Sequence, residues 1–136
     1  MLTDDTARTP PARLKLRVLP GRFAVCRLDA AHPIPGWFRP GPLAAITYTD
    51  DELSLVVPDE DVPEGVTAAR GWRAFMVLGP LEFSLTGVLA SLAAPLAEAH
   101  ISLFALSTFE TDYILVRAKD LDAARAAVAG RFDWTN

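Results

Sequence analysis

A chain of 136 residues has the size of one ordinary domain, or of two very small domains that share a core. Its net charge of −4 and pI near 5.1 argue against a nucleic-acid partner, because a nucleic-acid surface needs clustered lysine and arginine. No run approaches the roughly 18 consecutive apolar residues of a membrane span, and the N-terminus lacks a signal-peptide pattern. The single cysteine, Cys26, fits a reducing compartment. We therefore expect a cytoplasmic protein with no nucleic-acid or membrane partner, and a flexible tail at residues 1–12.

The first half of the chain predicts short strands and very little helix. Leu14, Leu16 and Val18 alternate with charged residues, a pattern typical of a strand with one solvent-exposed face. Cys26 falls within the next apolar run. We interpret it as a small buried hydrophobe rather than a nucleophile, because no histidine is adjacent to it. The expected strands are residues 14–18, 22–28, 43–49 and 53–57.

Polar segments separate these strands and the two halves of the chain. Asp50, Asp51 and Glu52 form an acidic tip that lacks the alternating ligand spacing and the glycine of a calcium loop, so we interpret it as a solvated turn. His32 lies in a loop rich in proline and glycine, without a second metal ligand at suitable spacing. Residues 58–66 are acidic and contain prolines, which indicates a boundary between halves. The sequence predicts no metal site, no cofactor and no catalytic residue.

The second half of the chain alternates strands with helices. An apolar stripe at helical spacing begins after the candidate caps Ser84 and Thr86, is interrupted by Pro95 and ends at His100. A second helix has its candidate cap at Asp120. The expected elements are strand 72–78, helix 86–99, strands 101–106 and 113–117, helix 120–129 and strand 131–134. This βαββαβ order predicts an α+β, ferredoxin-like fold with antiparallel sheets and helices packed on one face.

A polar turn joins the two central strands of this second half. Its hydroxyls and carboxylates come from Ser107, Thr108, Glu110, Thr111 and Asp112. Such a turn at the rim of a covered sheet suits a small polar ligand. It suits equally a hairpin that only needs turn residues.

Two segments resemble the ACT domain, a small βαββαβ module that binds amino acids at interfaces between domains or subunits. They are GPLEFSLTGV at residues 79–88 and STFETDYILV at residues 107–116. The resemblance is to the branch that includes bacterial tandem-ACT proteins and the ACT repeats of aspartate kinases and of the cytosolic arginine sensor of animal cells. It implies tandem units, with an ACT-like half of reduced helices at residues 13–68 and a C-terminal ACT domain at residues 69–136.

The same resemblance implies a ligand site at an interface between two ACT units. The loop before the first helix and the polar turn form one wall, and the start of the strand after the helix of a neighbouring unit forms the other. An open sheet edge and an apolar helix face also predict a homodimer. The residues implied are Glu82, Phe83, Ser84, Leu85, Thr86, Gly87, Thr108, Phe109, Glu110 and Asp112 for the first wall, and Ser102 and Leu103 for the second.

These observations favour a non-catalytic regulatory module that binds a small molecule, with an amino acid as the expected ligand. Arginine-binding members of the branch carry acidic side chains where this chain has Ser84 and Leu85, so the resemblance does not imply arginine specificity. A structural interaction module with a degenerate site remains an alternative. A small ferredoxin-like enzyme is a weaker alternative, because the candidate catalytic residues are scattered over different elements: Cys26, His32, His100 and Asp112.

Overall fold

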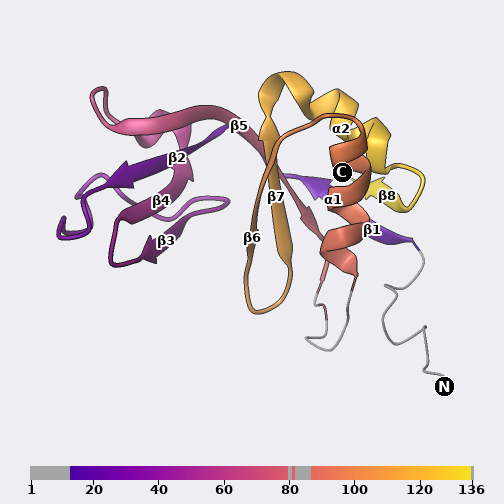
Figure 1. Cartoon of the computed structure of the whole chain (residues 1–136), viewed down its shortest axis with the longest axis horizontal. Coiled ribbons are helices and arrows are strands. Elements are labelled where there is room, and N and C mark those ends of the chain that lie inside the picture. Colours follow the sequence, from indigo (N-terminus) through magenta and orange to yellow (C-terminus); the bar gives the residue numbers. More distant parts are fainter. Residues whose placement is uncertain (1–12, 80, 82–86, 136) are drawn as a thin grey trace. The chain divides into compact units, whose positions relative to one another are not determined.

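The computed structural model describes residues 13–79, 81 and 87–135. Within this part the chain forms two compact units (Figure 1). We call residues 19–73 the N-terminal unit, and residues 13–18 together with residues 74–135 the C-terminal unit.

The C-terminal unit is built on a mixed sheet. Strand β1 (Leu14–Val18) pairs antiparallel with the second part of β5 (Thr67–Val77) and parallel with β8 (Phe132–Thr135). Strand β5 also pairs with β7 (Asp112–Arg117), which pairs antiparallel with β6 (Leu103–Ser107). The strand order in this unit is therefore β8-β1-β5-β7-β6.

Two helices cover one face of this sheet (Figure 1). Helix α1 (Val88–Glu98) buries residues at positions one, five and nine, the spacing of an apolar stripe, and α2 (Leu121–Val128) follows the short helix η3 (Ala118–Asp120). Alternate residues of the strands point into the same core, because side chains alternate between the faces of a sheet. The buried core residues are Leu16, Phe75, Val77, Val88, Leu92, Leu96, Ile101, Ile114, Val116, Ala124, Val128 and Phe132.

The helix ends follow the sequence signals in part. Pro95 lies inside α1 as expected. His100 follows the helix with a φ of 60°, and its N–H donates to the Ala97 carbonyl oxygen at 3.0 Å. Asp120 stands directly before α2, but its side chain caps no backbone N–H. The candidate caps of α1 at residues 84 and 86 lie outside the described residues, as does the tail at residues 1–12.

The parallel pairing of β1 with β8 differs from the expected antiparallel sheets. The first described strand of the chain inserts beside the last one, so antiparallel order does not extend through the C-terminal unit. Contacts also group residues 14–18 with the C-terminal unit and residues 69–73 with the N-terminal unit. The division into ACT-like halves at residues 68 and 69 stays a prediction.

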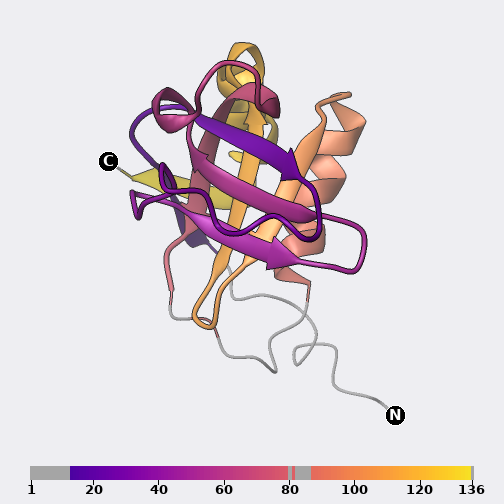
Figure 2. The same ribbon diagram turned by 90° about the vertical axis from the view of Figure 1, so that its left-hand side faces the viewer.

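The N-terminal unit is an antiparallel sheet of strand order β3-β4-β2-β5. Its strands are β2 (Phe23–Leu28), β3 (Ala45–Tyr48), β4 (Leu53–Pro58) and the first part of β5, and Figure 2 shows β2, β4 and β3 side by side. Cys26 is 1% exposed in its core. Burial raises the pKa of the Cys26 thiol, which keeps it protonated and fits its interpretation as a small buried hydrophobe.

A β-bulge interrupts β5 where it pairs with β2. Phe23 lies opposite Trp72 and Val25 opposite Ala69, so β5 contains one residue more than β2 over this stretch. Gly71 lies in the bulge with a φ of 78°, in the left-handed region that a residue with a side chain rarely adopts.

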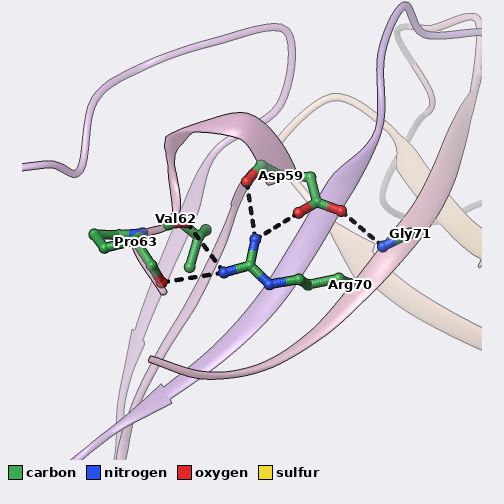
Figure 3. Close-up of polar contacts among 5 residues, drawn as sticks. All are labelled: Asp59, Val62, Pro63, Arg70 and Gly71. Atoms are coloured by element: carbon green, nitrogen blue, oxygen red, sulfur yellow. Dashed lines mark hydrogen bonds and ion pairs between the residues drawn. The ribbon is translucent and has the colours of Figure 1, made fainter. Parts of the chain in front are cut away.

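The Asp59 carboxylate holds this bulge in place (Figure 3). It lies in the 3-10 helix η2 (Asp59–Asp61), directly after β4. Its Oδ2 accepts the Gly71 N–H at 2.8 Å, and its Oδ1 accepts from Nη1 of Arg70 at 2.8 Å. The second guanidinium nitrogen of Arg70 donates to the carbonyl oxygens of Val62 and Pro63 at 3.0 and 3.1 Å. The Asp59 carboxylate therefore accepts hydrogen bonds from two adjacent residues of the bulge, Arg70 and Gly71.

Candidate functional site

The polar turn between β6 and β7 has its own hydrogen bonds. Thr108 donates its N–H to the Thr111 carbonyl oxygen at 2.8 Å, and its hydroxyl lies 3.3 Å from the Thr111 N–H, which donates to it. Ser107 and Asp112 face each other as the last cross-strand pair, and the Ser107 hydroxyl donates to Oδ1 of Asp112 at 2.6 Å. These bonds fix the direction of the Asp112 carboxylate.

The turn is also attached to the end of β5. The side chain of Thr111 is buried, and its hydroxyl donates to the Val77 carbonyl oxygen at 2.5 Å. The Leu81 N–H donates to the Glu110 carbonyl oxygen at 2.7 Å. The turn is therefore attached to the end of β5 and to Leu81.

Gly79 allows this close approach of the turn to β5. A β-carbon at this position would lie 2.9 Å from the Glu110 carbonyl oxygen and 3.3 Å from the β-carbon of Thr111. We expect Gly79→Ala to push the turn away from β5 and to lower the free energy of unfolding by about 1–2 kcal/mol. Urea unfolding measures this change. Gly130→Ala is the control, because nothing lies within 4 Å of a β-carbon there, and an equal loss in both variants would contradict the account.

Two hollows flank the turn within the C-terminal unit. The one we call the helix-side hollow has a volume of about 300 Å³. It is lined by residues 107–112 of the turn, by Leu81, and by the start of α1 at Gly87, Val88 and Leu89. The start of α1 and the turn thus face the same space from two elements.

The second hollow, which we call the sheet-side hollow, has a volume of about 500 Å³. Met76, Leu78, Gly79 and Tyr113 line it together with residues 108–111 of the turn. Met76 and Tyr113 alternate along their strands with residues that face the helices, so this hollow lies on the opposite face of the sheet. The turn therefore separates a helix-side hollow from a sheet-side hollow.

The helix-side hollow combines negative charge, backbone donors and apolar surface. Glu110 and Asp112 bring carboxylates, and the described lining contains no lysine, arginine or histidine. Gly87 precedes α1 with a φ of 84°, and its carbonyl oxygen accepts the Ser91 N–H at 2.8 Å. The first N–H groups of a helix have no partner within the helix and attract negatively charged groups. A zwitterion fits this arrangement, because its positive group can pair with a carboxylate of the turn and its negative group with the first N–H groups of α1.

The structure brings several of the residues expected at the site together. Gly87, Thr108, Phe109, Glu110 and Asp112 line the helix-side hollow. Residues 82–86, which include Glu82, Phe83, Ser84, Leu85 and Thr86, lie outside the described residues.

Ser102 and Leu103 are not among the lining residues of this hollow. They lie at the opposite end of β6 from the turn, since Leu103 begins the strand and Ser107 ends it. Four residues of a strand span about 13 Å. Within one copy, Ser102 and Leu103 are therefore not part of this hollow, and the second wall that the resemblance implies stays a prediction.

Sequence reasoning missed other residues of the site. Leu81, Val88 and Leu89 line the helix-side hollow as apolar residues. Thr111 was placed in the turn only as a polar residue, whereas its buried hydroxyl attaches the turn to β5. Nothing in a single threonine distinguishes a buried anchor from an exposed turn residue.

No cluster of three or more residues suited to holding a metal ion occurs in the described part of the chain. Cys26 lies in a strand core, His32 in an exposed loop and His100 after α1. Among the helices at the described positions, none has the length and apolar character needed to cross a bilayer.

Comparison with known proteins places this architecture in a family. The family model of the ACT domain matches residues 67–129, and a second family model, of an N-terminal domain, matches residues 21–65. A solved structure of a protein from Agrobacterium tumefaciens shares 36% sequence identity with this chain, with a TM-score of 0.84 over 93% of this chain and 96% of that one. The solved aspartokinase alpha and beta subunits have a TM-score of 0.61 at 16% identity, over 88% of this chain and 97% of that one, which shows a shared fold.

A protein of named function is also similar in sequence to part of this chain. Subunit 1 of the cytosolic arginine sensor for mTORC1 of Bos taurus is 33% identical over an alignment of 100 residues, and the match covers 65% of this chain and 30% of that protein. The chain thus matches less than a third of this relative's length. Fold and likeness together define an α+β domain with a ferredoxin-like fold. Residues 67–129 of the chain are an ACT domain.

Proposed function

We propose that this chain is a non-catalytic regulatory module that binds an amino acid in the helix-side hollow. The observation that carries the proposal is the hollow itself, in which the polar turn and the first turn of α1 face one space. Its volume lies at the lower end of the range for small-molecule pockets, which suits a ligand the size of an amino acid. The bovine relative is named as an arginine sensor, which supports the same class of ligand.

The two charged groups of an amino acid have different partners in this site. Its ammonium pairs with the Asp112 carboxylate, and its carboxylate accepts from the first N–H groups of α1. Its side chain then packs against the apolar lining of Leu81, Val88 and Leu89. A basic side chain can also reach Glu110, so arginine is one candidate among the amino acids.

A neighbouring ACT unit completes the proposed site. Ser102 and Leu103 of a second copy form the second wall, because their own copy holds them at the far end of β6. The proposal therefore includes a homodimer. The cytoplasmic location stays a prediction for this chain.

A calorimetric titration of the chain with each of the twenty amino acids tests the proposal. We expect at least one amino acid to bind and to raise the melting temperature, because a ligand that binds only the folded state stabilises it. Asp112→Asn serves as the matched control for binding in this hollow. A folded sample that binds none of the twenty contradicts the proposal.

A further inference from the structure

Phe109 is unusually exposed for an aromatic residue. It lies at the tip of the polar turn, and 79% of its surface is accessible. Water contact with so large an apolar ring is unfavourable, and exposed apolar groups beside a hollow mark interaction sites. The sheet-side hollow adjoins this ring and has an apolar floor of Met76, Leu78 and Tyr113.

We propose that a second copy of this chain docks on the sheet-side hollow and inserts its Phe109 there. The ring and the hollow adjoin each other in one copy, so a two-fold axis beside the turn brings each ring over the hollow of the other copy. Such an isologous contact closes as a dimer. Aromatic rings that fill pockets contribute much of the binding energy of an interface.

Charge complementarity supports a second copy as the occupant. Glu110 is exposed next to Phe109, and Arg17 is exposed next to Met76, since its Nη2 lies 3.4 Å from the Met76 sulfur. Within the described part of the chain neither Glu110 nor Arg17 forms an ion pair. The insertion of Phe109 beside Met76 of the other copy brings Glu110 towards Arg17 of that copy, twice in each dimer.

This inference does not depend on an amino acid in the helix-side hollow. The sheet-side hollow lies on the other face of the sheet, and its lining needs no ligand to be complete. A failed amino-acid titration therefore leaves the dimer contact standing. A monomeric chain would contradict both proposals, because the proposed ligand site also needs a second copy. Unchanged association of Phe109→Ser would contradict this contact alone.

Sedimentation velocity across a micromolar concentration series tests the contact. We expect the unmodified chain to dimerise and Phe109→Ser to weaken the association at least about tenfold. Glu110→Arg alone places two arginines at each contact, and Arg17→Glu alone places two glutamates there, so each variant alone should associate more weakly. Lys119→Glu makes the same change of charge on an exposed residue of η3 and should associate normally.

A mixture of the two charge variants gives the decisive result. In a mixed dimer the introduced arginine of one variant meets the introduced glutamate of the other at one contact, and the unaltered Glu110 and Arg17 meet at the second contact. An equimolar mixture should therefore recover the association that each variant loses. Circular dichroism shows that each variant remains folded. A monomeric unmodified chain, an unchanged association of Phe109→Ser or a mixture no more associated than its components would overturn the proposal.

Discussion

Replacing Asp112 with asparagine is expected to weaken amino-acid binding about tenfold or more while leaving the fold intact. The hydrogen bond from the Ser107 hydroxyl fixes the direction of the Asp112 carboxylate. The substitution removes the charge of this side chain but keeps its shape. A hydrogen bond to a charged group contributes about 1.5–3 kcal/mol, and each 1.4 kcal/mol is about a factor of ten in affinity. An asparagine oxygen can still accept the Ser107 hydroxyl. Calorimetry with the amino acid found in the titration measures the loss.

Ser107→Ala is the matched control for Asp112→Asn. It removes the same hydrogen bond within the protein and keeps the charge that the ligand ammonium needs. We expect it to change affinity less than Asp112→Asn does. An Asp112→Asn protein with a lower melting temperature and unchanged affinity shows instead that Asp112 is a structural turn residue.

Asp59→Ala is expected to lower the free energy of unfolding by about 2–3 kcal/mol. The substitution leaves the Gly71 N–H in the bulge without its acceptor and removes the carboxylate partner of Arg70. The loss of a hydrogen bond to a charged group, together with an unsatisfied donor in a partly buried place, accounts for this magnitude. Guanidinium unfolding of the full chain measures it.

Asp61→Ala is the control for Asp59→Ala in the same short helix. Asp61 pairs with Arg39 at 2.9 Å, and the side chain of Asp61 is 10% exposed, whereas that of Arg39 is 73% exposed. Water can therefore solvate the Arg39 guanidinium when the carboxylate is removed, and we expect a loss of about 1 kcal/mol or less. The two substitutions change the charge equally. Equal losses of stability would show that the bulge contacts of Asp59 add nothing beyond a surface ion pair.

Much of the C-terminal unit follows from local patterns. The apolar stripe of α1 predicted that helix and the face that it buries, and the apolar run at residues 113–116 predicted strand β7. Pro95 and His100 were expected inside and after the helix, and the structure places both there. These signals are local, so one sequence is enough to find them.

The remaining features depend on contacts between distant residues. Periodicity shows which face of β1 is buried, but it does not show that β8 is its neighbour. Strand β5 begins at Thr67, earlier than expected, because pairing with β2 holds residues of low β-propensity such as Ala68 and Gly71 in the sheet. The anchoring of the turn by Thr111 also depends on a distant residue, because its hydroxyl donates to the carbonyl oxygen of Val77.

The candidate site was predicted in part and for similar reasons. The polar residues of the turn were evident from composition, whereas the apolar lining from Leu81 and Leu89 depends on where α1 begins in space. The distance between the turn and Ser102 follows from the length of β6. The predicted strand at residues 101–106 already placed Ser102 far from the turn. The sheet-side hollow carries no sequence signal, because its floor comes from alternate residues of two strands.

A crystal structure of the chain grown with the amino acid identified by titration tests the central claim most directly. We predict electron density for the ligand in the helix-side hollow, with its ammonium at the Asp112 carboxylate and its carboxylate at the first N–H groups of α1. Density for the ligand at any other place, with the helix-side hollow empty, would contradict the account.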